Sequence, residues 1–163
     1  GAEPDVMCIA KGMGAGFPLG GCLATREAAK GLTFGAHGST YGGNPLGMAV
    51  GIAAFDLMTS PGFLEEINRT AGALTQGLAS LADRHSDIVE EIRGKGLLRG
   101  LKLNIAPKGV QLAARERKLL VGTASDNVVR LAPPLIISEA HVREAIAALD
   151  DSLAAVKSAE RAA

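Results

Sequence analysis

The sequence predicts an α/β chain in which the end of a large parallel-sheet domain is followed by a small α+β C-terminal domain. A short apolar run near the start, bounded by glycines, is typical of a strand buried on both faces of a parallel sheet. Beyond Ser60, apolar residues recur at helical spacing, and strands then alternate with helices. We predict part of the large domain at residues 1–59, the small domain at 60–157 and a loosely ordered tail at 158–163.

Two strands joined by a glycine-rich loop are predicted at the N-terminal end. The strands are expected at 6–10 and 22–25, and the stretch between them is too rich in glycine for regular structure. Lys11 directly follows the first strand, at the carboxyl end where open α/β sheets bind their ligands. Cys8 and Cys22 lack metal-type spacing, so we expect buried, reduced thiols and no metal site.

A buried helix is predicted next. Residues 26–30 are expected to form a short helical stretch, and a polar, glycine-rich segment follows it. Asn44 offers an N-cap side chain and Pro45 suits the first helical position. The helix from there to about Met58 contains almost only apolar or small residues, so we expect it to be buried.

The small domain is predicted to begin and end with helices. Apolar residues from Phe63 to Leu81 recur three and four positions apart, which indicates an amphipathic helix. A last helix follows Ser138, its predicted N-cap. The remaining elements are strands at 88–92, 97–103 and 128–131 and a helix at about 110–118.

Charge and hydropathy argue against several classes of partner. Lysine plus arginine and aspartate plus glutamate both number 17, so no excess charge favours nucleic acid or an anionic membrane surface. Every apolar run is interrupted before it could span a bilayer, and the start of the chain has no signal-peptide pattern and no initiator methionine. We expect a soluble, cytoplasmic protein with a small-molecule partner. Its start resembles the middle of a longer protein, which would make it a fragment, a truncated gene product or half of a split enzyme.

Lys11 is the first candidate for chemistry. Burial at a strand end would lower the pKa of its ammonium group, and the free amine could then attack an aldehyde. Glycines at 12, 14 and 16 would let a flat ligand approach the backbone, although neither a dinucleotide fingerprint nor a P-loop is present. The alternative is a solvated lysine at the end of a strand.

Three further side chains are candidates for binding anions. Ser39 and Thr40 bring two hydroxyls close to a helix N-terminus, which suits a phosphate or a carboxylate, and the alternative is an ordinary turn. Arg130 interrupts an apolar run, where a guanidinium needs an anionic partner. That partner is either a substrate carboxylate or an internal Asp or Glu.

Five segments, taken together and in order, resemble the class III aminotransferases, and within them the acetylornithine and succinylornithine aminotransferases. No single segment is specific, but the five cover nearly the whole chain. They are residues 3–7 with 10–12, 17–20, 37–46, 93–97 and 126–135.

The resemblance implies a fold-type-I transferase that depends on pyridoxal 5′-phosphate. It implies that Lys11 binds the cofactor covalently and moves a proton, and that Thr40 holds the cofactor phosphate of the neighbouring subunit in a homodimer. It also implies that Ser39 contacts the acylated ornithine and that Arg130 takes a substrate carboxylate. The implied reaction moves the δ-amino group of N-acetylornithine to 2-oxoglutarate, in arginine biosynthesis.

Alternatives stay open. Transaminases of ornithine, succinylornithine or 4-aminobutyrate, and glutamate-semialdehyde aminomutase, belong to the same family. A non-catalytic remnant, which would keep residues 60–156 as a folding and dimerisation module, is a different class of answer. The family's phosphate loop, ring-stacking aromatic residue and pyridine-binding aspartate would all precede Gly1. We therefore expect the 163 residues alone to be inactive and poorly soluble.

Overall fold

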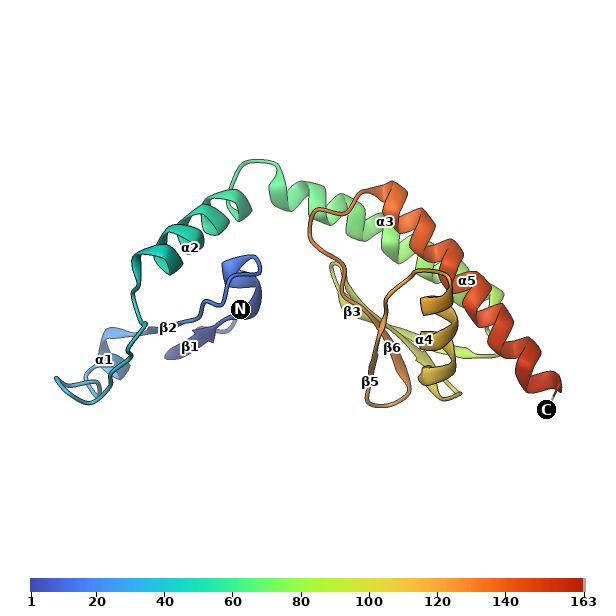
Figure 1. Ribbon diagram of the computed structural model, residues 1–163, viewed down its shortest axis with the longest axis horizontal. Coiled ribbons are helices and arrows are strands. Elements are labelled where there is room, and N and C mark those ends of the chain that lie inside the picture. The colour runs from blue at the N-terminus through green and yellow to red at the C-terminus, as the bar shows by residue number, and fades with distance from the viewer. Residues whose placement is uncertain (163) are drawn as a thin grey trace. The chain divides into compact units, whose positions relative to one another are not determined.

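The computed structural model describes residues 1–162, which divide into two compact units (Figure 1). The first unit runs from Gly1 to Phe63, and the second begins at Leu64.

The first unit contains a two-stranded ribbon and short helices. β1 (Val6–Ile9) pairs antiparallel with β2 (Gly21–Ala24). A 3₁₀ turn, η1 (Lys11–Gly14), lies in the segment that was predicted to lack regular structure. The helices α1 (Arg26–Ala29) and α2 (Pro45–Met58) follow.

The predicted start of α2 is confirmed. The Asn44 side-chain oxygen accepts a hydrogen bond from Gly47 N at 2.7 Å, which satisfies one of the backbone donors left free in the first turn. Pro45 occupies the first turn, where its missing N–H is not needed. The Asn44 amide also donates to Tyr41 O at 2.9 Å, so one side chain fixes both the helix start and the turn before it.

The predicted burial in this unit is wrong within this chain. Val6 of β1 and Leu23 of β2 are 52% and 50% exposed, and both cysteines are exposed as well. In α2 the buried residues are Gly47 and Ala54. The physical reason is that an apolar face becomes buried only against a partner. In the described residues the ribbon has no third strand, and the element that packs on α2 is η1.

The second unit is an antiparallel sheet covered by helices, as the predicted small α+β domain requires. Its strands lie in the order β3-β4-β6-β5, and neighbouring strands are antiparallel throughout. Helices α3 and α5 run side by side (Figure 1), and residues of both contribute to the core. The strands are β3 (Val89–Lys95), β4 (Leu98–Leu103), β5 (Gly122–Ala124) and β6 (Val128–Leu131), and the helices are α3 (Phe63–Arg84), α4 (Pro107–Glu116) and α5 (Glu139–Ala162).

Alternating residues of the sheet and one stripe of each helix form the core. Leu101 of β4 and Val129 of β6 have no exposed surface, and neither do Leu78 of α3 and Leu149 of α5. The helices approach closely at Gly77, where a built Cβ would lie 2.8 Å from Ile146 Cγ1. The apolar residues that recur with the period of a strand or of a helix in the sequence therefore all face one common core.

Three details of this unit differ from or agree with the sequence-based expectations. β5 was not predicted, because Gly122–Ala124 is short and carries no hydrophobic alternation. The predicted cap is confirmed, since His141 N donates to Ser138 Oγ at 3.4 Å. The residues after 157 were expected to be loosely ordered, whereas α5 continues to Ala162.

Among the described residues, no single helix is both long enough and apolar enough to cross a membrane. The helices α2 and α3, which are bent at the break between them, meet the combined criteria of length and composition only when they are counted together.

A cluster of charged side chains ties the end of α3 to α5. His85 is buried and hydrogen-bonds Asp150 Oδ1 through Nε2, while Arg84 Nη2 lies 2.9 Å from Asp150 Oδ2. The hydrogen bond to His85, together with the bond and charge of Arg84, lowers the pKa of the Asp150 carboxyl.

We expect this cluster to make the stability of the second unit sensitive to acid. Because the folded pKa of Asp150 lies below its unfolded value, the stabilisation is complete above the ordinary aspartate pKa of about 3.9. It is lost as the pH falls through the lowered folded pKa. Urea unfolding of the wild type and of Asp150→Asn, compared at pH values from about 5 to 2, should show a steeper loss for the wild type. Parallel curves would remove Asp150 from the acid response.

Candidate functional site

Lys11 lies where β1 ends and η1 begins. Its φ is 55°, in the left-handed region that a residue with a side chain adopts only at an energetic cost, and such strain clusters at functional positions. The residue is exposed, so its predicted burial is wrong for this chain. Its Nζ has no hydrogen bond or ion pair with any residue that the structure describes. Lys11 therefore presents an uncommitted primary amine.

The loop beside Lys11 leaves room for a ligand. A side chain built at Gly12 would meet nothing within 4 Å, and Gly16 has a φ of 108°, which glycine adopts without strain. Buried Gly14 packs against Leu19, so the loop is anchored while the backbone next to Lys11 stays open. This agrees with the expectation that the glycines allow close approach to the backbone.

Ser39 and Thr40 differ in how their hydroxyls are used. Ser39 Oγ accepts a hydrogen bond from Gly42 N at 3.0 Å. This hydroxyl therefore stabilises a turn, as the alternative interpretation of the sequence expects. Thr40 is exposed, and its hydroxyl has no hydrogen-bond partner among the described residues. Within the part of the chain that the structure describes, no hydrogen bond joins either hydroxyl to Lys11.

Arg130 lies on β6 and points away from the core of the second unit. Its neighbours Val129 and Leu131 are 0% and 6% exposed, whereas Arg130 itself is exposed. Strand register places a glycine on each side of it, Gly100 on β4 and Gly122 on β5. The guanidinium is thus held on a strand with no side chain at either directly paired position.

The glycine at position 122 makes space for Arg130. A Cβ at Gly122 would lie 3.3 Å from Arg130 Nε and 3.4 Å from Nη2, so a side chain there would press on the guanidinium. Gly122 is not among the glycines with positive φ, so its backbone does not itself demand glycine. A side chain at position 122 would therefore require the Arg130 side chain to shift.

Internal acids on this sheet face are committed to other cations. Asp126 lies 2.7 Å from Arg93 Nη1 and 3.6 Å from Lys102 Nζ, and the bond from Arg93 lowers the pKa of the Asp126 carboxyl. Glu91 pairs with Arg93 at 2.7 Å. Arg130 has no acidic partner among the described residues. The internal partner considered from the sequence is therefore not found there, and the guanidinium remains available to an external carboxylate.

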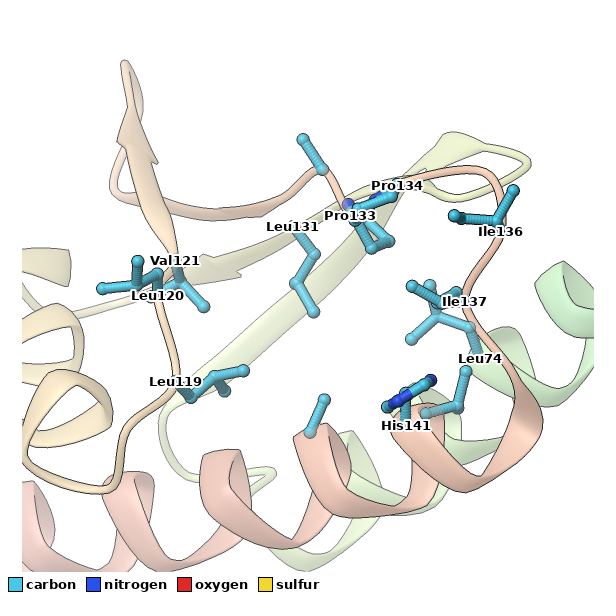
Figure 2. A pocket seen from close by; sticks show the side chains of 13 residues that line it. Leu74, Leu119, Leu120, Val121, Leu131, Pro133, Pro134, Ile136, Ile137 and His141 are labelled. Carbon is cyan, nitrogen blue, oxygen red and sulfur yellow. The ribbon is translucent and has the colours of Figure 1, made fainter. Parts of the chain in front are cut away.

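An apolar cavity of about 530 Å³ lies elsewhere in the second unit (Figure 2). Leucine, isoleucine and proline side chains line it, and His141 is its one titratable side chain. His141 Nδ1 is within 3.1 Å of Ser138 N and 3.0 Å of Ser138 Oγ, so the ring is engaged at the start of α5. None of the four candidate residues is among the side chains that line this cavity.

The candidate residues divide between the two units. Lys11, Ser39 and Thr40 belong to the first, and Arg130 belongs to the second. Sequence reasoning overlooked Gly100 and Gly122. Their signal is the strand register opposite Arg130, which for Gly100 requires the β4–β6 pairing and for Gly122 requires β5, a strand that was not predicted.

Comparison with known proteins extends over both units. Residues 1–153 match the family Aminotransferase class-III. The acetylornithine aminotransferase of Brucella melitensis is 56% identical over 146 residues, which cover 90% of this chain and 36% of that protein.

Solved structures of the same family have the same fold. Acetylornithine aminotransferase from Elizabethkingia anophelis matches with a TM-score of 0.84 and 30% identity, over 93% of this chain and 41% of that one. An ornithine aminotransferase from Toxoplasma gondii, which has partial occupancy of PLP at its active site, matches with a TM-score of 0.88 and 28% identity, over 97% and 38%.

These matches confirm the predicted fold class, with the antiparallel pairing of β1 and β2 as a detail that the parallel pattern did not indicate. The chain spans between 36% and 41% of the length of the three relatives described. On the family match and the 56% identity, the chain belongs to the class III aminotransferases.

Proposed function

We propose that this chain is the C-terminal part of an aminotransferase that moves the δ-amino group of N-acetylornithine to 2-oxoglutarate. The observation that supports this best is Lys11, a strained, exposed and uncommitted lysine at the end of β1. It lies in a chain 56% identical to an acetylornithine aminotransferase. Residues 1–59 would belong to the large cofactor-binding domain and 60–157 to the small domain of a cytoplasmic homodimer in arginine biosynthesis.

The residues present fit the parts of pyridoxal 5′-phosphate that they would hold. Lys11 offers a free primary amine with open space at Gly12, as an aldehyde-bearing cofactor requires. Thr40 offers a hydroxyl without a partner among the described residues, which suits a phosphate oxygen of the neighbouring subunit's cofactor. The chemistry that the cofactor supplies when bound is the withdrawal of electrons from the carbon that carries the transferred amino group.

The remaining steps belong to side chains of this chain. Lys11 Nζ would take the proton from the substrate carbon that bears the amino group. In the second half of the reaction it would give a proton to the carbon of 2-oxoglutarate that receives the amino group. Arg130 would hold a substrate carboxylate with its two-pronged guanidinium, and Ser39 would contact the acylated ornithine. The amino donor and 2-oxoglutarate both carry carboxylates, so one arginine can serve both halves of the reaction.

Arg130→Gln is expected to weaken substrate binding more than turnover. The change removes the positive charge and the bidentate geometry, so KM for 2-oxoglutarate should rise about tenfold to a hundredfold, the equivalent of about 1.5–3 kcal/mol for a charged hydrogen bond. Arg143→Gln on α5 is a matched control, because Arg143 is exposed and its ion pair with Glu139 is 4.0 Å long. An unchanged KM for Arg130→Gln would remove this residue from carboxylate binding. Both variants are measured in a chimera that joins the upstream part of the Brucella melitensis relative to this chain.

A chimera tests the proposed function directly. The upstream part of the Brucella melitensis relative is joined to this chain, and glutamate formation from 2-oxoglutarate is followed with N-acetylornithine, ornithine or 4-aminobutyrate as donor. Activity that is highest with N-acetylornithine would support the proposal. Preference for ornithine or 4-aminobutyrate would favour another transaminase, and a folded but inactive chimera would favour a non-catalytic remnant.

Trapping on the 163-residue chain gives a second measurement. Pyridoxal phosphate and borohydride are added, and the modified lysines are mapped by mass spectrometry. A stoichiometric adduct confined to Lys11 would show that this chain already presents the lysine for cofactor attachment. An adduct scattered over exposed lysines such as Lys30 would count against that role in the isolated chain.

A further inference from the structure

The guanidinium of Arg130 lies on the β5 side of its strand. A Cβ placed on Gly122 would lie 3.3 Å from Arg130 Nε and 3.4 Å from Nη2, so both nitrogens border the space that this glycine leaves. On the other side, a Cβ placed on Gly100 of β4 would lie 2.7 Å from Val128 Cγ1. Val128 is 7% exposed, and its side chain already fills the space over Gly100. Gly122 is therefore the neighbour that leaves room for the arginine.

The start of β5 is anchored to α4 by Gln111. Gln111 Nε2 donates to Val121 O at 3.0 Å, and Val121 directly precedes Gly122. Gln111 Oε1 accepts a hydrogen bond from Lys108 Nζ at 2.9 Å. Because an ammonium group can only donate, the amide oxygen faces Lys108 and the amide nitrogen is left for Val121. One side chain of α4 thus holds the backbone next to Gly122.

The turn after β5 is held by side chains of β3 and β4. Asp126 and Asn127 have φ values of 63° and 54°, in the left-handed region, so the turn depends on support from its surroundings. Asp126 pairs with Arg93 of β3 at 2.7 Å and with Lys102 of β4 at 3.6 Å. β5 is therefore fixed at both ends, although it pairs with β6 through only three residue pairs.

These two anchors fix the register in which Gly122 lies opposite Arg130. β5 is three residues long and has no apolar alternation that would set its register. A slip by one residue would bring Val121 or Thr123, both with branched side chains, opposite Arg130. The anchors therefore keep a residue without a side chain beside the guanidinium.

We propose that β5 is a platform that sets the direction of the Arg130 guanidinium, with Gly122 as a specificity-determining residue and Gln111 as a positioning residue. This inference rests on the proposed function, because the ligand concerned is the carboxylate of 2-oxoglutarate or of the amino donor. A guanidinium binds a carboxylate through two parallel hydrogen bonds, so its direction decides where the carboxylate lies. The contacts that build the platform all join residues of the second unit.

Gly122→Ala and Gly122→Val test the platform in the chimera. Either side chain requires the guanidinium to shift, and the backbone accepts both because Gly122 has no positive φ. With alanine, KM for 2-oxoglutarate should rise about threefold to tenfold, since a misplacement of about 1 Å can cost about a hundredfold, and valine should raise it further. In both variants kcat should fall less than KM rises. Gly72→Ala on α3 is a matched control, because a Cβ there meets nothing within 4 Å.

Gln111→Met tests the anchor on α4. Methionine is close to glutamine in length but cannot donate to Val121 O, so KM should rise by a smaller factor than in Gly122→Ala. In the Arg130→Gln background, neither substitution should raise KM further, because both act through the arginine. A merely structural role would instead give the same loss in both backgrounds.

Titration calorimetry with glutarate, a dicarboxylate that cannot accept an amino group, measures binding without turnover. Its Kd should rise together with KM in both Gly122 variants. Unchanged KM and Kd in Gly122→Val, where Arg130→Gln weakens both, would overturn the platform and leave the proposed function intact. Unchanged values in Arg130→Gln itself would overturn the carboxylate role of the arginine, and the platform with it. Weaker glutarate binding by the Gly122 variants of an inactive chimera would support the platform and count against the proposed function.

Discussion

Replacing Lys11 with alanine is expected to eliminate covalent capture of pyridoxal phosphate and to lower the turnover of the chimeric enzyme by about 10²–10⁴-fold, the usual contribution of a positioned proton-transfer group. Its amine would serve both as the attachment point and as the base. Alanine removes both, and at a φ of 55° it should introduce no contact that lysine did not already make. Borohydride trapping and kcat in the N-acetylornithine assay measure the two losses separately.

Lys30→Ala is the matched control for Lys11. Lys30 is also an exposed lysine of the first unit, but it follows α1 directly and its ammonium is paired with Glu27 of that helix. We expect near-normal trapping and turnover for this variant. Full activity of Lys11→Ala, or equal losses in the two variants, would refute the assignment of Lys11.

Leu78→Ala is expected to destabilise the second unit by about 2–5 kcal/mol, the range for removing a buried leucine side chain. Leu78 lies in the middle of α3 and has no exposed surface, in a core shared by the sheet and α5. The cavity left behind can collapse only by moving the helix or the strands beneath it. The free energy of unfolding is obtained from urea titrations of the whole chain, followed by far-ultraviolet circular dichroism.

Leu112→Ala provides the comparison on a solvent-facing position of α4. Leu112 is 47% exposed, so the same substitution removes far less buried surface, and we expect a loss of about 1 kcal/mol or less. Equal losses of unfolding free energy for Leu78→Ala and Leu112→Ala would mean that Leu78 does not lie in the core of the second unit.

The sequence predicted those elements of the fold that carry their own local signals. Asn44 and Pro45 predict the start of α2, because Asn44 caps the helix with its side chain and Pro45 lacks an N–H that the first turn does not need. Both effects act within one turn. The core stripe of α3 was visible because 3.6-residue periodicity marks the buried face. β5 was missed because its stability comes from pairing with β6, which no local pattern shows. Burial of α2 was predicted from composition, but burial depends on a partner that these residues do not contain.

In the candidate site, too, the sequence did not predict features that depend on contacts between distant residues. Arg130 was identifiable because it interrupts an apolar run, but the sequence indicated a guanidinium that needs an anionic partner, whereas the side chain is exposed on β6. The place of Gly122 beside Arg130 was not identifiable, because only the pairing of β5 with β6 brings the two residues together. For Lys11 the sequence indicated the position correctly but the environment wrongly, since exposure is a property of everything packed around a residue.

The alternation along β6 assigns core packing and solvent exposure to different residues of one strand. Val129 and Leu131 face the core, while Arg130 between them faces outward. Under the proposed function, substitutions at Arg130 would change how a carboxylate is bound while Val129 and Leu131 keep the core packed. If the proposal for Arg130 holds, a strand built in this way would let substrate recognition change on an unchanged scaffold.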